Sequence, residues 1–352
     1  MTSETTPGLR ERLAQGPLIC AEGYVFELER RGYLQAGPFV PEVVLEHPEQ
    51  VQALHEEFVH AGSDVVQAFT YYSHREKMRL VGKEDLLEPI NRQALEIASG
   101  VAGRNGSLLA GNVCNTNVYD PGDEATYAQV RSMFDEQVGW AANANADFVI
   151  GETFRYLGEA ELALAAIREA GLPSVITLVV DHDDAMRDGP ALNDACQRLV
   201  DAGADVVGLN CSRGPATMVP LLAPLVDAVD APIAALPVPY RTTTAEPTMQ
   251  SLRDPWAAAV EGTEEDRAFP TGLDPFTCTR HEVAEFTTAA AAAGVQYFGL
   301  CCGAAPHHVR AMAEALGRTP PASRYSTDMS RHAYFGTDPS LRSNMQEYRE
   351  RL

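Results

Sequence analysis

The sequence has few basic residues and no hydrophobic segment of membrane-spanning length. Lysine and arginine together number 27 against 49 aspartates and glutamates, a formal net charge of −22 in 352 residues. A negative field of this size repels nucleic-acid phosphates and anionic lipid surfaces. No run of about 18 apolar residues occurs, and the first residues contain no apolar signal core. We therefore expect a cytoplasmic protein that binds neither nucleic acid nor membranes.

Cysteine is also scarce, and its count is odd. The chain has seven cysteines, whereas a secreted disulfide framework usually has an even number in a short chain. We predict free thiols in a reducing compartment. Cys20, Cys114 and Cys196 are expected to be small buried core residues, and Cys278 lies in an irregular stretch.

A recurring unit organises most of the chain: an amphipathic helix, a stop residue and a short apolar run. Four copies place glycine where a left-handed helix cap belongs, namely Gly62, Gly171, Gly203 and Gly294, and a fifth copy has asparagine there. Three further apolar runs bring the total to eight predicted strands. They lie within residues 17–23, 65–69, 107–113, 141–154, 174–180, 206–211, 231–237 and 297–301.

Apolar strands that alternate with helices are typical of a parallel sheet buried on both faces. Eight of them predict an α/β fold of the (β/α)8 TIM-barrel type, whose usual size of ~250 residues or more suits this chain. An open doubly wound sheet is the alternative, but GVAGRNG at 100–106 follows a helix and so lacks the context of a dinucleotide-binding fingerprint. We predict a barrel domain at 1–318, including a long loop at 238–280, and a C-terminal extension at 319–352 that ends in a helix and is a candidate for oligomerisation.

Three cysteines follow predicted strands, where the active site of such a barrel lies. Cys211 ends the sixth strand, and Cys301 and Cys302 end the eighth. We expect these strand ends to face one another across the barrel mouth. Three converging thiols would bind Zn²⁺ at ~2.3 Å and leave a fourth position for a substrate thiol. Zinc converts such a thiol into a thiolate, which is the nucleophilic form.

Two other clusters are competing candidates. The acidic stretch DHDD at 181–184 follows the fifth strand and offers oxygen ligands for a cation such as Mg²⁺, although we favour a solvated acidic loop. His307 and His308 follow the adjacent cysteines and offer a fourth metal ligand, which would make the site closed and structural. Because Pro306 precedes them, we favour the first turn of a helix instead.

The motifs GLNC (208–211) and GLCCG (299–303) resemble the two cysteine motifs of the zinc-dependent homocysteine S-methyltransferase family, whose members are (β/α)8 barrels. EGYVFELERRGYLQAGPFVPEVVLEHPEQV, AGSDVVQAFTYYS and the late PPAS extend the likeness over nearly the whole chain, to the betaine–homocysteine branch. The resemblance implies that Cys211, Cys301 and Cys302 bind Zn²⁺ beside homocysteine. The homocysteine thiolate would attack the methyl group of a quaternary ammonium donor and give methionine, with no cofactor carrying the methyl group.

The resemblance also implies roles for other residues. Glu152 matches the carboxylate that receives the homocysteine amino group, and Asn210 matches a position near the metal, where an amide can orient a thiolate or the substrate. Phe39, Tyr71 and Tyr72 match an aromatic wall that holds a methylated onium donor by cation–π attraction.

Three departures from the branch concern the substrates. Where the branch has Asp-Gly-Gly, this chain has Ala21, Glu22 and Gly23, so a substrate-binding carboxylate is missing unless Glu22 replaces it. An expected tryptophan is Phe39, and an expected aromatic residue is Thr153, which leaves less aromatic surface for the donor. A sulfonium, a bulkier betaine or a cyclic betaine is therefore a candidate donor. The alternative function is a barrel that binds betaine-like cations without turnover or methylates another thiol.

Overall fold

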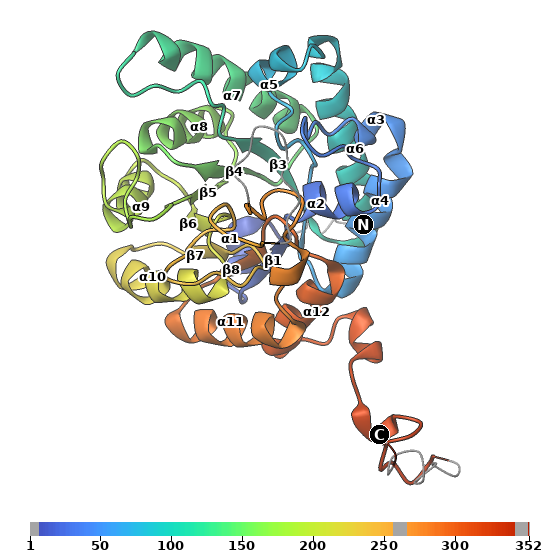
Figure 1. Ribbon diagram of the computed structural model, residues 1–352. Coiled ribbons are helices and arrows are strands. Elements are labelled where there is room, and N and C mark those ends of the chain that lie inside the picture. Colours follow the sequence, from blue (N-terminus) through green and yellow to red (C-terminus); the bar gives the residue numbers. More distant parts are fainter. Residues whose placement is uncertain (1–6, 256–265, 342–350, 352) are drawn as a thin grey trace.

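The computed structural model describes residues 7–255, 266–341 and 351. Within this part, eight parallel strands pair in sequence order and β1 pairs with β8, which closes the barrel (Figure 1). The predicted (β/α)8 TIM-barrel fold is therefore confirmed. The strands are β1 (Leu18–Ala21), β2 (Val65–Gln67), β3 (Leu108–Cys114), β4 (Phe148–Phe154), β5 (Ser174–Leu178), β6 (Val206–Asn210), β7 (Ile233–Leu236) and β8 (Tyr297–Leu300).

Helices surround the strands and connect each to the next (Figure 1). The long ones are α4 (Pro48–Ala61), α6 (Leu87–Asn105), α7 (Ala125–Asn143), α8 (Leu157–Glu169), α9 (Leu192–Asp201), α10 (Pro215–Ala228), α11 (Arg280–Ala293) and α12 (Pro306–Ala315). Shorter helical elements are α1 (Leu9–Leu13), α2 (Tyr24–Arg30), α3 (Val43–Glu46), α5 (Arg75–Leu80), η1 (Glu84–Leu86), η2 (Asp274–Phe276), η3 (Pro321–Tyr325) and η4 (Met329–Arg331). No helix in the described residues is long and apolar enough to cross a membrane.

The predicted helix stops are confirmed by the backbone. Gly62 and Gly294, which follow α4 and α11, have φ angles of 117° and 100°. Asn145 follows α7 with a φ angle of 56°, so the asparagine copy of the repeating unit stops its helix in the same way. Asparagine tolerates this left-handed conformation better than most residues.

Two hydrophobic layers hold the barrel together because successive strand residues point to opposite faces. Ile19 of β1 faces the layer between strands and helices, whereas Cys20 faces the barrel interior. Leu9 and Leu13 of α1 belong to the interior layer and close the amino-terminal end of the barrel. The buried polar residues Gln67, Asn112 and Glu152 lie toward the opposite end, where the strands finish.

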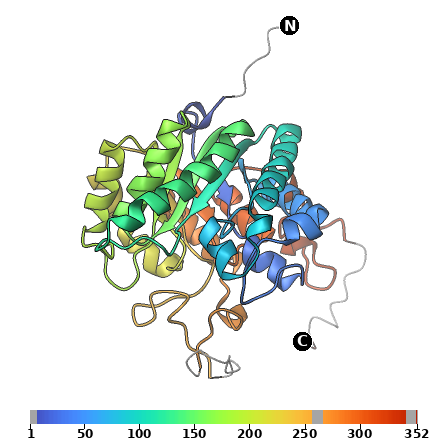
Figure 2. The same ribbon diagram turned by 90° about the horizontal axis from the view of Figure 1, so that it is seen from above.

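The described part of the long segment 238–280, residues 238–255 and 266–280, packs over the carboxyl ends of the strands. In its described part, Val238, Tyr240, Met249, Leu252, Ala268 and Leu273 form one buried cluster with Cys211 and Cys301. Isolated bridges join Arg213 to Thr248 and Tyr240 to Thr277. Figure 2 shows this segment at the side of the molecule opposite α1. It therefore encloses the cysteine-bearing strand ends in an apolar environment.

The predicted placement of the two cysteine segments across the barrel mouth is wrong. In the closed barrel, β7 alone lies between β6 and β8. The strand across the mouth from β6 is β2, four strands away, so Cys211 and the Cys301–Cys302 pair lie on neighbouring parts of the rim. Both segments are anchored to the end of β7: the Cys211 N–H donates to the Leu236 carbonyl and the Cys301 N–H to the Pro237 carbonyl, each at 2.9 Å. Because both cysteine segments are hydrogen-bonded to the end of the same strand, the cysteines lie close together without having to reach across the barrel mouth.

The C-terminal extension leaves the barrel after α12 and runs outward (Figure 1). It contains η3 and η4, and several of its large apolar side chains are exposed: Tyr325, Met329, Tyr334 and Phe335. The helix predicted in SLRSNMQEYRERL falls largely on residues 342–350 and 352, which lie outside the described residues.

Gly208 of β6 tests how closely the strands approach. A Cβ atom there would overlap the backbone carbonyl oxygen of Ala234 in β7, so the strand would have to move. We expect Gly208→Ala to lower the free energy of unfolding by about 2 kcal/mol or more, measured by chemical denaturation. Gly139→Ala in α7 is the matched control, because a Cβ atom there meets nothing within 4 Å; it should raise stability by about 0.5–1 kcal/mol. Equal effects of the two changes would contradict the packing argument.

Candidate active site

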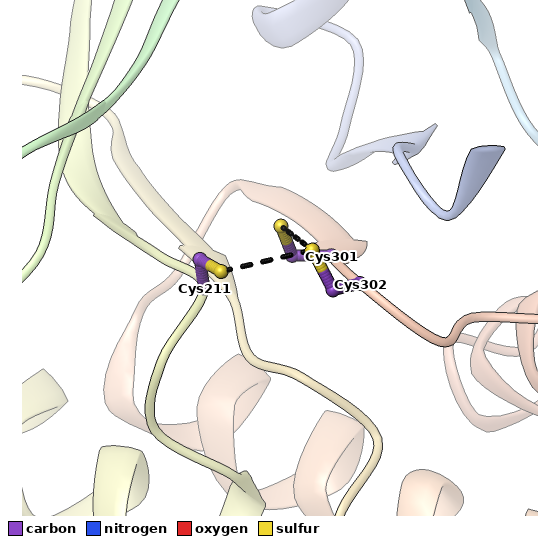
Figure 3. Close-up of side chains that lie close together, drawn as sticks. All are labelled: Cys211, Cys301 and Cys302. Carbon is purple, nitrogen blue, oxygen red and sulfur yellow. Dashed lines mark hydrogen bonds between the residues drawn. The ribbon is translucent and has the colours of Figure 1, made fainter. Parts of the chain in front are cut away.

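Three thiols meet at the carboxyl end of the barrel. Cys211 directly follows β6, and Cys301 and Cys302 directly follow β8 (Figure 3). The Cys302 Sγ lies 3.9 Å from the Cys211 Sγ and 3.8 Å from the Cys301 Sγ. Cys211 and Cys301 are buried and Cys302 is partly exposed. The structure thus brings together the three cysteines singled out in the sequence.

The spacing of the sulfur atoms fits a common metal ion. Three thiolates at ~2.3 Å from a tetrahedral centre would be about 3.8 Å apart, which is close to the two distances found. All seven cysteines, each within the described residues, are free. The donor set and its spacing therefore suit a soft or borderline divalent metal better than oxygen-seeking cations.

The cluster also favours one ionised thiol. Hydrogen bonds from Cys301 and Cys302 lower the pKa of the Cys211 thiol well below its usual value, and the positive charge of Arg155 adds to the effect. Cys211 and Ser212 both have a φ angle of 57°, in the left-handed region that residues other than glycine rarely adopt. This backbone turn directs Cys211 away from the path of its strand and toward β8.

A buried carboxylate lies beside the thiols. Glu152 of β4 accepts hydrogen bonds from the side-chain amides of Gln67 (2.8 Å), Asn112 (2.6 Å) and Asn210 (2.9 Å). Burial raises the pKa of Glu152 to about 7, although the bonds from Asn112 and Gln67 oppose that shift. Three neutral amides hold the carboxylate in place without neutralising it.

A second carboxylate follows β1. Glu22 is 7% exposed, and neither of its carboxylate oxygens has a hydrogen-bond partner among the described residues. Its carboxylate, that of Glu152 and the Cys301 Sγ contribute ligand atoms that all lie within 4.8 Å of one another. Burial, reinforced by the charge of Glu152, raises the pKa of Glu22 well above its usual range. Gly23 is the N-cap residue of α2, and a Cβ atom there would lie 2.5 Å from the Ala304 carbonyl oxygen.

Asn210 connects the carboxylate to the thiols. Its Nδ2 donates to Glu152 and to the Thr153 hydroxyl (3.0 Å) and lies 3.9 Å from the Cys301 Sγ. Its Oδ1 accepts from the Thr153 backbone N–H at 3.0 Å. Thr153 has a φ angle of 66°, so this amide stabilises a backbone conformation that threonine seldom adopts.

The predicted aromatic residues lie in two places. The rings of Tyr71 and Tyr72, which follow β2, have centroids 4.3 Å apart. Burial raises the pKa of Tyr72 to about 12, with smaller contributions from Cys302 and Cys211, so this pair lies near the thiol cluster. Phe39 instead packs against Phe26, with centroids 5.9 Å apart, and no ring contact joins it to the two tyrosines in the described part of the chain.

The competing clusters are accounted for by other contacts. In the stretch 181–184, Asp181 pairs with Arg155 and Arg187, and Asp184 pairs with Arg213. These residues do not form a metal-binding group in the described residues. The stretch is therefore not simply the solvated acidic loop that we favoured, because Asp181 and Asp184 form ion pairs with arginines.

His308 is a helix-start residue, as we favoured. α12 begins at Pro306, and the Ala305 N–H donates to the His308 Nδ1 at 3.2 Å. The His308 Nε2 lies 3.0 Å from the Cys278 carbonyl oxygen. Both ring nitrogens thus have protein partners, and the histidine is not a fourth ligand of the thiol cluster.

Sequence reasoning missed the residues that support Glu152. Gln67 and Asn112 lie in β2 and β3, whose other inward-facing residues include Val65, Leu108 and Ala110. The available signal was their position: a polar residue at an even spacing from inward apolar residues points into the barrel.

The fold and the residues at its carboxyl end define a class: a TIM barrel that brings three free thiols and two buried carboxylates together where its strands end, a donor set suited to a metal ion. A family model described as homocysteine S-methyltransferase matches residues 18–316. The chain belongs to that family.

Curated relatives agree over most of the chain. Betaine–homocysteine S-methyltransferase 1 of Danio rerio is 36% identical over 312 residues, covering 88% of this chain and 75% of that protein. S-methylmethionine–homocysteine S-methyltransferase of Mus musculus is 33% identical over 353 residues, covering 98% and 92%. The metallated form of the homocysteine methyltransferase MmuM from Escherichia coli has the same fold, with a TM-score of 0.67 at 18% identity, covering 87% of this chain and 99% of that one.

Removal of one thiol tests the metal site. We expect Cys301→Ala to bind Zn²⁺ at least ~100-fold more weakly, because it loses a direct ligand where loss of a supporting residue alone costs 10–100-fold. Cys196→Ala is the matched control, since Cys196 is buried in α9, within the layer between strands and helices. Metal content after dialysis against a chelator of known affinity is the measurement. Full zinc retention in Cys301→Ala would refute the ligand assignment.

Proposed function

We propose that this protein transfers a methyl group from a betaine-type donor, either a quaternary ammonium or a sulfonium compound, to homocysteine and so forms methionine. The observation that carries the proposal is the cluster of Cys211, Cys301 and Cys302, with sulfur atoms 3.8–3.9 Å apart along two of its edges. Membership of the homocysteine S-methyltransferase family supports the same reaction.

The three cysteines would hold Zn²⁺, since their number and spacing suit it. Bound there, Zn²⁺ would supply a Lewis acid that lowers the pKa of a fourth, substrate thiol. The surrounding residues then have distinct tasks. Asn210, whose amide lies between Glu152 and Cys301, would orient the substrate beside the thiols.

Glu22 and Glu152 would bind the homocysteine ammonium group. A primary ammonium has three N–H donors and no acceptor. The two Glu22 oxygens and the Asn112 Oδ1 are buried acceptors without a hydrogen-bond partner among the described residues. Unpaired buried acceptors are costly, so a bound ammonium would relieve that cost. Glu22 would thereby replace the carboxylate missing at Ala21, and Gly23 leaves room for the close approach of Ala304.

Tyr71 and Tyr72 would provide one part of the donor wall, and Phe39, which packs against Phe26 rather than against the tyrosines, would provide a separate part. A methylated onium cannot donate strong hydrogen bonds and is held by aromatic faces, each contributing about 0.5–2 kcal/mol. In the transfer itself, the thiolate sulfur forms a bond to the methyl carbon while the bond from carbon to nitrogen or sulfur breaks. The electron pair stays on the leaving atom, so a cation and a thiolate become a neutral amine or sulfide and a thioether.

A second candidate function rests on the departures from the branch. Thr153 and Phe39 stand where larger aromatic residues are expected, and Ala21 stands where a carboxylate is expected. These residues are compatible with a barrel that binds betaine-like cations without turnover or that methylates another thiol. Incubation of the zinc-loaded protein with homocysteine and a panel of ammonium and sulfonium donors separates the two. Methionine from any donor supports the first, and donor binding without product from every donor supports the second.

Glu152→Gln tests the role of the carboxylate. We expect the KM for homocysteine to rise about 10–100-fold, because a charge-assisted hydrogen bond to the ammonium is lost, with a smaller effect on the donor KM. Glu169→Gln is the control, since Glu169 pairs with Arg131 on the exposed side of α8. Methionine formation under varied homocysteine is the measurement. An unchanged homocysteine KM in Glu152→Gln would remove Glu152 from this role.

We also propose that the barrel domain ends near residue 318 and that 319–352 joins copies of the chain into a homo-oligomer. The support is the exposed group Tyr325, Met329, Tyr334 and Phe335 in the extension, since exposed apolar patches mark interaction sites.

The odd number of free thiols supports a cytoplasmic location.

The oligomer proposal predicts a change in mass. We expect the variant carrying Tyr334→Ser and Phe335→Ser to shift toward a single-chain mass in light scattering, with its circular dichroism unchanged. Leu80→Ser is the matched control because Leu80 is 64% exposed on α5, away from the extension. An unchanged oligomeric mass in the double variant would contradict the proposal.

A further inference from the structure

A pocket lined by arginines opens beside the thiol cluster. It has a volume of about 530 Å³, and four arginines line it: Arg155 after β4, Arg187 after β5, and Arg253 and Arg267 in the long segment 238–280. Asp181 and Glu246 are the acidic residues in its lining. Arg253 pairs with Asp266 at 2.8 Å, so the positive surplus that matters here is that of Arg155 and Arg187, which share one carboxylate in a chain whose net charge is −22. Such a local reversal of sign concentrates anions at one place on an otherwise repelling protein.

Contacts within the pocket hold two of the arginines in fixed positions. The Arg155 Nε lies 3.3 Å from an Asp181 carboxylate oxygen, and the Arg187 side chain lies 2.7 Å from the same oxygen. The Arg187 backbone N–H also donates to the Arg155 carbonyl at 2.9 Å. One carboxylate shared by two guanidinium groups leaves one positive charge unbalanced. Asp181 therefore orders the pair without neutralising it.

The pocket is linked to the site described above by one hydrogen bond and by one short stretch of chain. Gln250 lines the pocket and accepts a hydrogen bond from the Ser212 hydroxyl at 3.0 Å, and Ser212 directly follows Cys211. On the other side, Arg155 follows Thr153 by two residues. Burial lowers the pKa of Arg155, but the charges of Asp181, Cys211 and Tyr71 outweigh burial and raise it, so Arg155 lies within electrostatic reach of the thiol cluster and the tyrosine pair.

We propose that this arginine-lined pocket binds the anionic group of the methyl donor, a carboxylate on the same molecule as the onium centre, with Arg155 and Arg187 as specificity-determining residues. The inference rests on the proposed methyl transfer. A donor of this kind has its onium end at the tyrosines and thiols and its carboxylate in the pocket. The acidic stretch 181–184 would then serve to hold Arg155 and Arg187 in place through Asp181.

The donor is the better source of this carboxylate than homocysteine. Glu22 and Glu152 lie after β1 and in β4 and come within 4.8 Å of the Cys301 Sγ, whereas the pocket is reached from Cys211 through the hydrogen bond between Ser212 and Gln250. An ammonium bound at Glu22 and Glu152 keeps the α-carboxylate of homocysteine, two bonds away, near those residues. A donor that approaches the sulfur from the Cys211 side would have Gln250 and Arg155 in the pocket wall beside it.

Matched donors isolate the contribution of the carboxylate. One pair is 4-(trimethylammonio)butanoate and butyltrimethylammonium, and a second is 3-(dimethylsulfonio)propanoate and propyldimethylsulfonium. Within each pair the onium group is the same and only one member has a carboxylate. Initial rates with varied donor and varied homocysteine are measured for the zinc-loaded full chain and for Arg155→Gln, Arg187→Gln and Arg198→Gln. Arg198 is the control, because it pairs with Glu161 on the exposed side of α9.

We expect Arg155→Gln and Arg187→Gln each to raise the KM of the carboxylate-bearing donor about tenfold or more, the cost of one charge-assisted hydrogen bond. The KM of the matched donor without a carboxylate and the KM of homocysteine should stay within about twofold, and Arg198→Gln should change neither. Arg155→Lys should recover part of the loss, because it keeps the charge but not the bidentate geometry. A KM rise that is equal for both members of a pair, or confined to homocysteine, would overturn the inference.

A binding measurement separates this inference from the proposed function. If no donor yields methionine, the proposed reaction fails for these donors, but titration calorimetry with each carboxylate-bearing compound still tests the pocket. Weaker binding to Arg155→Gln and Arg187→Gln than to the unchanged chain would support the pocket. Equal binding to both variants, or no binding to the unchanged chain, would overturn it.

Discussion

The common anchoring of two chain segments on the end of β7 is the constraint on which the site depends. Cys211 and Cys301 donate their backbone N–H groups to the carbonyls of consecutive residues, Leu236 and Pro237. Closure of the barrel by β1 and β8 fixes where β8 ends relative to β7. Side chains ninety positions apart in the chain are therefore held at metal-binding distance by main-chain geometry, before any ion contributes.

Around that cluster the protein arranges charge in two different ways. On the barrel side, neutral amides support a buried carboxylate, and Glu22 adds a second carboxylate whose oxygens lack partners in the described residues. On the loop side, arginines outnumber carboxylates around a pocket. Under the proposed function, the carboxylates would hold the ammonium end of homocysteine and the arginines would hold the carboxylate end of the donor, with the substrate sulfur atom between them. Orientation of this kind supplies much of the rate advantage of a bimolecular transfer.

The sequence predicted the barrel well because its signals are local. Apolar runs gave the strands, and Gly62, Gly294 and Asn145 stop their helices as expected. The cysteines were found because they follow strands in recognisable motifs. The position of β6 relative to β8 was predicted wrongly, because in this closed barrel a single strand, β7, lies between them.

What the sequence did not reveal depends on contacts between distant residues. Gln67 and Asn112 support Glu152 from 85 and 40 positions away. The acidic stretch 181–184 suggested a cation site by composition alone, and only its pairing with arginines from other loops changes that interpretation. The packing of residues 238–255 and 266–280 over the thiols likewise has no periodic pattern by which it could be predicted.

The left-handed backbone positions have a consequence for engineering. In the part of the chain that the structure describes, eight residues other than glycine have positive φ angles. Asn117, Asn145 and Asp266 belong to tolerant types, and the other five are all candidate site residues or their neighbours: Phe39, Tyr72, Thr153, Cys211 and Ser212. Strain of this kind persists where surrounding structure enforces it. Directed evolution for heat resistance would therefore first replace these five residues with ones that suit a left-handed backbone. Variants selected for heat resistance without an activity screen would then lose side chains of the candidate active site.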